Sequence, residues 1–366
     1  MPEKTERLGL IMRPLDTMFF RDGRPFASGH RSESGLPAPQ TFTGALRSHL
    51  LLRAGADFTA LSRAARSGAA LAESIRAAGA PGWIAEISVR GPWLAELSGH
   101  GAPPSPWLEA PANLRPSGGE GAPFVQLSPR RQAMPGWDGA CGMKPLWNPA
   151  AKRVKSREVR YIGFSSLKDY LSGNGLPSSA LRKADSLYGF DDRTGIAVDP
   201  GTFVAREPFI YSSRMLVLAK NVCLYGEICA PSGGELRKVF ASPGPMGFGG
   251  EGRYVEVRAT GPLSWPSVQG KTALLYLASP AIFKDTWKPD FLGDGGRMVS
   301  AAVDDPFAVS GWDMALGGPK PTRFGVRAGT VYFLDGPAPA GDSLCAAPSG
   351  AMQGYGFYLK GVWNYV

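Results

Sequence analysis

The sequence predicts an α+β protein of two domains, each built on an antiparallel sheet. The chain has 366 residues, a length that suits two domains with a large buried core. Its apolar stretches predict, in order, a strand, a helix, strands, a long insertion, and then strands, a short helix and strands. Glycine (48) and proline (33) are abundant among well-spread aromatic residues, which indicates turns and ordered loops rather than disorder. We expect domains of residues 1–200 and 201–366.

The first domain is predicted to open with a buried strand and a helix. Residues 8–20 are mostly apolar and predict the strand. Thr41 or Thr43 is expected to cap the helix that follows. A second helical stretch is predicted near 60–78 and another strand at 83–89. We interpret His49 as a core histidine. One face of the first helix is predicted to consist of Phe42, Leu46, His49, Leu50 and Arg53.

An insertion over about 97–168 is expected to interrupt the first domain. Its opening part, 99–123, is dense in proline and glycine and predicts a long ordered loop. Residues 130–168 hold nine basic and two acidic residues, a net +7 of the +9 that the chain carries. Cations with aromatic rings between them suit single-stranded nucleic acid, and a solvated basic face is the alternative. The rings are Trp137, Trp147, Tyr161 and Phe164.

The second half is predicted to be mostly strands. Residues 190–195 contain two aspartates and a glycine, and we interpret them as a turn. Long strands are expected at 203–211 and 215–225, and a short helix at 234–240. Two further strands and a glycine–aromatic cluster complete the chain, at 272–283, 325–334 and 354–363.

The stretch of greatest functional interest is 243–257, where five glycines fall within nine residues. Such a backbone takes left-handed dihedrals, approaches a ligand closely and presents bare amides to an anion. Arg253 and Tyr254 follow directly and offer a fork for phosphate and a ring for stacking, with Phe248 as a second ring. A helix precedes this stretch and a strand follows it, so its Gly-x-Gly-x-x-Gly spacing is not a Rossmann site. A solvated turn without a ligand is the alternative.

The sequence carries no recognisable signature of a metal site or of a common catalytic class. Its four cysteines form no Cys-x-x-Cys pair and it has three histidines, so we expect no metal and no cofactor. It contains no Gly-x-Ser-x-Gly elbow and no kinase signature. His30 lies beside arginines, as the base of a metal-independent ribonuclease would, and this reading stays an alternative. Without an apolar segment of membrane-spanning length, the protein is expected to be cytoplasmic.

Several motifs occur together along almost the whole chain. The chain resembles the RAMP superfamily of CRISPR proteins, and in particular the Cmr-module subunit at the foot of type III-B effector complexes. The motifs that carry the resemblance are Pro14-Leu-Asp with Phe19-Phe-Arg-Asp-Gly-Arg-Pro-Phe, Thr43-Gly-Ala-Leu-Arg-Ser, Gly247-Phe-Gly-Gly-Glu-Gly-Arg, and Ser310-Gly-Trp-Asp with Pro319-Lys-Pro and Gly329-Thr-Val-Tyr-Phe. Supporting motifs are Asp192-Arg-Thr-Gly-Ile and Ser279-Pro-Ala-Ile-Phe.

The resemblance implies two ferredoxin-like (RRM-like) domains, with the glycine-rich loop carried by the C-terminal domain, 201–366, and facing RNA. Proteins of this family bind the 5′ tag of the CRISPR RNA (crRNA) in antiviral defence and are not the nuclease. They pair with the large polymerase/nuclease subunit and with the backbone RAMP subunit. We therefore expect a non-enzymatic RNA-binding subunit, with an assembly scaffold that has no RNA affinity of its own as a further alternative. The expected RNA-binding residues are Gly247, Gly249, Gly250, Gly252, Arg253, Tyr254, Arg21, Arg24, Arg47 and His30, with Arg47 placed near the positive end of its helix.

Overall fold

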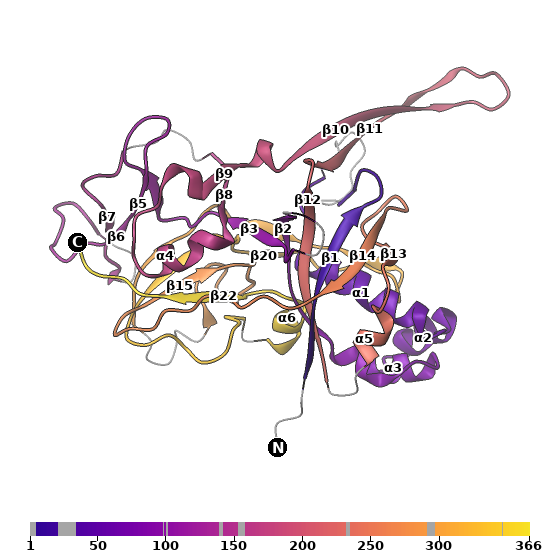
Figure 1. Ribbon diagram of the computed structural model, residues 1–366. Helices are drawn as coiled ribbons and strands as arrows, with labels where there is room; N and C mark the ends of the chain where they lie inside the picture. Colours follow the sequence, from indigo (N-terminus) through magenta and orange to yellow (C-terminus); the bar gives the residue numbers. More distant parts are fainter. Residues whose placement is uncertain are drawn as a thin grey trace.

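The computed structural model describes residues 5–20, 34–97, 99, 102–138, 142–152, 158–231, 235–290, 297–345 and 347–366. Its body consists of two antiparallel sheets (Figure 1). The eight-stranded first sheet has the order β13 (Gly244–Gly247), β14 (Tyr254–Thr260), β1 (Glu6–Pro14), β12 (Val222–Ala230), β2 (Ser88–Glu96), β3 (Ser105–Glu109), β8 (Arg160–Gly163) and β9 (Leu181–Lys183). The second sheet has the order β16 (Arg297–Ala302), β21 (Val331–Asp335), β15 (Ala273–Leu277) and β22 (Tyr358–Gly361).

Helices are few and short, and most cover one face of the first sheet (Figure 1). The α-helices are α1 (Pro39–Arg53), α2 (Phe58–Arg66), α3 (Leu71–Ala77), α4 (Leu167–Leu171), α5 (Glu235–Val239) and α6 (Pro348–Met352). The 3₁₀ turns are η1 (Gly82–Glu86), η3 (Phe164–Ser166), η4 (Ser178–Ala180) and η5 (Ala184–Ser186). The predicted α+β class with antiparallel sheets is confirmed.

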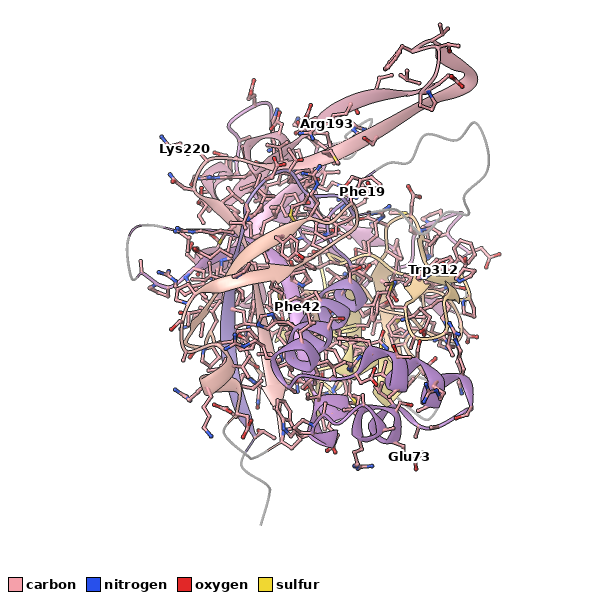
Figure 2. All side chains as sticks on the ribbon, turned by 90° about the vertical axis from the view of Figure 1, so that its right-hand side faces the viewer. Phe19, Phe42, Glu73, Arg193, Lys220 and Trp312 are labelled. Atoms are coloured by element: carbon pink, nitrogen blue, oxygen red, sulfur yellow. The ribbon has the colours of Figure 1, made fainter. Side chains whose placement is uncertain are left out.

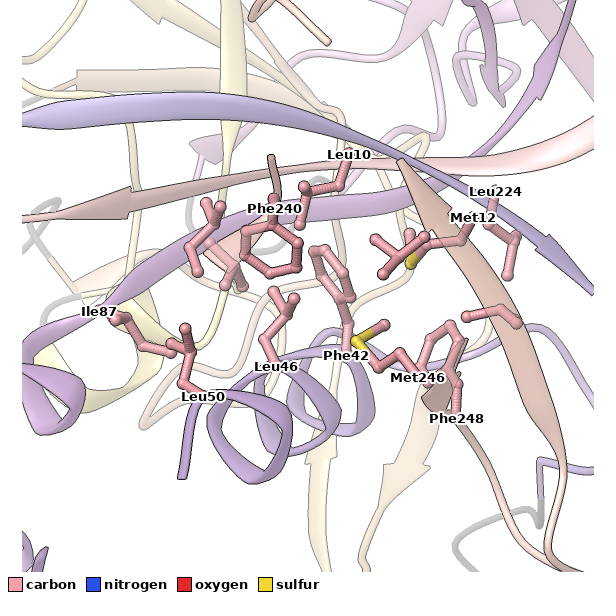
Figure 3. Packing of buried hydrophobic residues seen from close by; sticks show 14 of the residues in the cluster. Leu10, Met12, Phe42, Leu46, Leu50, Ile87, Leu224, Phe240, Met246 and Phe248 are labelled. Carbon is pink, nitrogen blue, oxygen red and sulfur yellow. The ribbon is translucent and has the colours of Figure 1, made fainter. Parts of the chain in front are cut away.

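Alternation along β1 divides the core into two layers. Leu10 and Met12 pack with Phe42 and Leu46 of α1 on one face of the sheet (Figure 3). Ile11 points to the other face, because successive side chains of a strand alternate, and there it joins the cluster that includes Tyr276 of the second sheet. The first sheet is therefore buried on both faces, by helices on one side and by the second sheet on the other.

Three expectations about the first half are corrected. The N-cap of α1 is Ala38, and Thr43 instead donates its hydroxyl to the carbonyls of Pro39 and Gln353. The helical stretch near 60–78 is interrupted between α2 and α3. Residues 83–89 are mainly the 3₁₀ turn η1, and the strand expected there begins at Ser88.

Two segments interpreted as loop or turn are strands. The proline-rich segment 99–123 contains β3, which pairs with β2 and β8 inside the first sheet. Residues 190–195 lie in β10 (Tyr188–Val198), which pairs with β11 (Ala205–Leu218) in a long hairpin that projects from the body (Figure 1). Ion pairs such as Asp192–Arg214 (3.6 Å) stabilise strands whose sequence has no apolar alternation. The strand expected at 203–211 lies in β11, whereas the stretch 215–225 spans the end of β11, a break at 219–221 and the start of β12 (Val222–Ala230).

The domain boundary expected at residue 200 does not separate the two sheets, because residue 200 lies in the β10–β11 hairpin. Strands β12, β13 and β14 come later in the chain and still pair within the first sheet.

No helix in the described part of the chain is long and apolar enough to cross a membrane. The remaining strands form two-stranded pairs: β4 (Leu114–Pro116) with β5 (Phe124–Gln126), β6 (Ser128–Pro129) with β7 (Leu146–Trp147), β17 (Phe307–Val309) with β20 (Arg323–Gly325), and β18 (Trp312–Asp313) with β19 (Gly318–Pro319).

Candidate nucleic-acid interface

The glycine-rich turn, residues 248–253, connects β13 to β14 at the end of the first sheet where β1 finishes. The amide of Leu15, just after β1, donates to the carbonyl of Tyr254 (3.1 Å), which holds the two strand ends together. A strand flanks the turn on each side, so the exclusion of a Rossmann site is confirmed.

Two of the glycines are needed because the chain packs against itself. Gly249 has φ +93°, and a Cβ atom there would lie 2.6 Å from the carbonyl oxygen of Phe19. The amide of Gly250 donates to the same oxygen (2.9 Å). Gly252 has φ +61° and open space around it, and Gly247 is exposed. Close packing on Phe19 therefore explains Gly249 and Gly250, whereas Gly247 and Gly252 lie open to solvent.

Half of the amides in the turn are occupied by the protein. Phe248 donates to the Arg253 carbonyl (2.9 Å), Arg253 donates to the Gly250 carbonyl (3.3 Å), and Gly250 donates to Phe19. Towards the rest of the described chain, the amides of Gly249, Glu251 and Gly252 donate no hydrogen bond. These three amides are the ones left for an anion.

The two rings expected to stack on bases have different environments. Phe248 is 1% exposed, with its ring 5.0 Å from that of Phe20 and 6.1 Å from that of Phe42 (Figure 3). It anchors the turn in the core, so a stacking role for Phe248 is wrong. Tyr254 is 52% exposed and its ring is accessible.

Arg253 makes an ion pair with Asp16, its Nη1 lying 2.5 Å from Oδ2. The Arg253 side chain is 18% exposed, and its buried Nε has no hydrogen-bond partner among the described residues. The Thr17 amide, which donates to Oδ1 (2.7 Å), lowers the pKa of Asp16, as do the charges of Arg253 and Arg193. No sequence pattern indicates this pair, because only the pairing of β1 with β14 brings residue 16 to residue 253.

Arg193 comes from the β10–β11 hairpin and lies near Phe19 at this end of the molecule (Figure 2). A groove of 640 Å³ opens between the end of β1 and the base of that hairpin. Arg13, Leu15 and Thr17 line it together with Val217. Its volume suits a small organic group such as a base and ribose. The Thr17 hydroxyl is buried without a hydrogen-bond partner in the described part of the chain.

Arg47 is the one other predicted residue that lies in the described part of the chain, and it does not join this cluster. Arg47 was expected near the positive end of its helix, and this is wrong because α1 begins at Pro39, more than two turns earlier. Its Nε donates to the carbonyl of Ile84 (3.4 Å), and burial lowers the pKa of its guanidinium. Arg21, Arg24 and His30 lie outside the described residues. Among the residues that are described, no group of three or more His, Cys, Asp and Glu side chains is arranged to hold a metal ion.

Comparisons with known proteins identify the family. The profile of the family described as CRISPR-associated protein (Cas_Cmr3) matches residues 10–363. A chain in the cryo-EM structure of the Type III-B Cmr-beta bound to cognate target RNA matches with a TM-score of 0.52 and 14% identity, covering 90% of this chain and 86% of that chain. The same assembly with cognate target RNA and AMPPnP gives a TM-score of 0.50 and 15% identity, covering 89% and 86%. A search of the curated proteins gave no significant match. Since the family profile covers almost the whole chain, this protein belongs to the Cas_Cmr3 family, the RAMP-type subunits of type III-B Cmr complexes.

Proposed function

We propose that this protein is a non-catalytic RNA-binding subunit of a type III-B CRISPR ribonucleoprotein and binds the 5′ tag of the crRNA at the end of the first sheet. Family membership supports the assignment to the complex, and Arg253 carries the proposal for the site. Asp16 holds one edge of that guanidinium, beside a turn in which three amides donate no hydrogen bond to the described residues.

The chemistry of this end of the sheet suits a ribose-phosphate chain. A guanidinium presents five donors, and Asp16 takes one of them, so Arg253 has donors left for a phosphate. Charge-assisted hydrogen bonds to phosphate are stronger than neutral ones, and the open amides of Glu251 and Gly252 would add to them. The accessible ring of Tyr254 offers a stacking surface for a base. The groove at the base of the β10–β11 hairpin would take a second base.

We also propose that each sheet is the sheet of one ferredoxin-like domain. Along the chain the first domain would comprise β1, α1, β2, β12, α5 and β14, the βαββαβ arrangement. In space the neighbours are β14, β1, β12 and β2, with the last strand beside the first. The second sheet repeats this order with β22, β15, β21 and β16. On this division residues 97–221 are an insertion in the first domain, and the glycine-rich turn belongs to that domain.

The partners of the subunit would be the large polymerase/nuclease subunit and the backbone RAMP subunit of the complex. Several exposed apolar side chains in the segment 312–324 favour a protein partner, which would cover them. These side chains lie on and around β18 and β20: Trp312 (59% exposed), Met314 (84%), Leu316 (54%) and Phe324 (58%).

Replacing the guanidinium tests the site. Arg253→Ala is expected to weaken binding of tagged guide RNA about tenfold or more, since a charged hydrogen bond contributes roughly 1.5–3 kcal/mol. Fluorescence anisotropy with tagged and tagless RNA measures this. Arg258→Ala, on the same strand but away from the turn, is the matched control and should leave the affinity unchanged. An unaltered affinity of a folded Arg253→Ala variant would exclude this residue from the site.

The charge of Asp16 provides a test of opposite sign. Asp16→Asn keeps an acceptor for Arg253 but removes a negative charge that competes with phosphate. Because exposed ion pairs are weak, we expect tagged RNA to bind about two- to fivefold more tightly. Weaker binding would contradict the proposal.

Cleavage of RNA is tested with the same preparations. Unprocessed repeat RNA should stay intact when incubated with them, whereas a single cut beside the repeat stem would contradict a non-catalytic subunit.

A further inference from the structure

A second basic and aromatic surface lies around β6 and β7, at the opposite end of the molecule from the glycine-rich turn (Figure 1). We call it the Trp137–Trp147 surface. It belongs to the segment 130–168 that carries a net +7 in the sequence. The proposed tag site leaves this charge without a role.

The two indoles of this surface are accessible on an ordered backbone. Trp137 is 51% exposed and Trp147 is 45% exposed. The indole Nε1 of Trp137 donates to the carbonyl of Met143 (2.9 Å), so its polar atom is satisfied and its ring faces remain for a ligand. The amide of Lys144 donates to the carbonyl of Val299 (2.8 Å), which attaches the segment before β7 to β16 of the second sheet.

Cations lie directly beside the rings. The guanidinium carbon of Arg130 is 5.7 Å from the ring centre of Trp147. The ammonium of Lys144 and the guanidinium of Arg131 lie 5.0 and 5.3 Å from the ring centre of Tyr365. Lys144 also donates to the carbonyl of Arg131 (3.0 Å), which joins these two cations at the ring of Tyr365, and Arg130 precedes Arg131 in the chain.

We propose that the Trp137–Trp147 surface binds single-stranded RNA, independently of the tag site. Bases stack on accessible rings while neighbouring cations neutralise the phosphates, and this pairing of groups favours an unpaired strand over a duplex. An acidic protein face would satisfy the cations but gives no reason for two indoles beside them. RNA rather than DNA is the expected occupant because the proposed function makes the chain an RNA-binding subunit, and on this choice the inference rests on the proposed function.

The test uses the full chain and a tagless oligouridine of about 12 nucleotides, a length within the usual site size of such surfaces. The double variant Trp137→Ala/Trp147→Ala is expected to bind it about tenfold or more weakly, by the loss of stacking. Trp312→Ala/Phe324→Ala removes two equally exposed rings elsewhere and is the matched control, with unchanged affinity expected. Arg130→Gln/Arg131→Gln should make the dependence of log affinity on log salt shallower by about 1.4, for two phosphate contacts on a single strand.

The outcome for this surface is separable from that for the tag site. A failure of Arg253→Ala to affect tagged RNA would leave the present test untouched, because the oligouridine test compares only the Trp137→Ala/Trp147→Ala variant with its control pair. Unchanged oligouridine affinity in the folded Trp137→Ala/Trp147→Ala variant would overturn the inference. So would an equal loss in the control pair, tighter binding of the corresponding duplex, or an effect seen with single-stranded DNA and not with RNA.

Discussion

At the scale of single residues, the glycine-rich turn combines two different needs. Gly249 and Gly250 are small because the end of β1 packs on them, through the carbonyl and ring of Phe19. Gly252 has open space around it, and Gly247 is exposed beside the ring of Tyr254, so a ligand has access to both. The sequence predicted a bend stripped of side chains, but it gave no way to distinguish glycines that the fold requires from those facing solvent.

The Gly249→Ala variant tests this distinction. Alanine at φ +93° would be strained by about 1–2 kcal/mol. Its Cβ would also meet the Phe19 carbonyl, and overpacking of this kind costs about 1–3 kcal/mol more. Urea unfolding should therefore show a marked loss of stability. Gly244→Ala is the control, because no atom lies within 4 Å of its Cβ position. Equal stability of the two variants would contradict the packing explanation.

At the scale of elements, sequence periodicity predicted the helix that packs on the core. It missed strands that form only because they pair with neighbouring strands. Phe42, Leu46 and Leu50 recur at helical spacing and are buried in α1, as expected. Strand β3 was missed because its Pro106 and glycine-rich surroundings hide it, and pairing with β2 and β8 makes it a strand. Strand β10 was missed because a projecting hairpin has no buried face to impose alternation.

Helix α1 also carries a group that should make stability depend on pH. The ring of His49 stacks on that of Phe240, with centres 5.6 Å apart. Burial lowers the pKa of His49 from 6.5, and the charge of Arg53 lowers it further. Below pH 6.5 the unfolded chain therefore binds a proton that the folded chain does not, and the free energy of unfolding should fall as pH decreases. Urea titrations above and below this pH, with His49→Gln as comparison, measure the effect. An identical pH dependence in the variant would contradict it.

At the scale of the whole molecule, the candidate site is assembled by topology. Asp16 follows β1, Arg193 lies in β10 and Arg253 precedes β14. The pairing of β1 with β14 and the bridge between Met18 and Leu216 of β11 bring their charges together. Sequence motifs indicated the family, which the family profile confirmed, but no local pattern links these three residues. The segment that leads from the first sheet to the second is held by the buried carboxylate of Glu227. It accepts hydrogen bonds from the Tyr225 hydroxyl, the Leu263 amide and the Trp265 indole.

The central claim, that the end of the first sheet receives the 5′ tag, is tested most directly in the assembled ribonucleoprotein. Photocrosslinking with thiouridine placed at each position of the tag, followed by peptide mass spectrometry, reports which residues the tag touches. We predict crosslinks to peptides that contain residues 13–17 and 247–254. Crosslinks from the tag that fall only on other peptides, or only on other subunits, would contradict the claim.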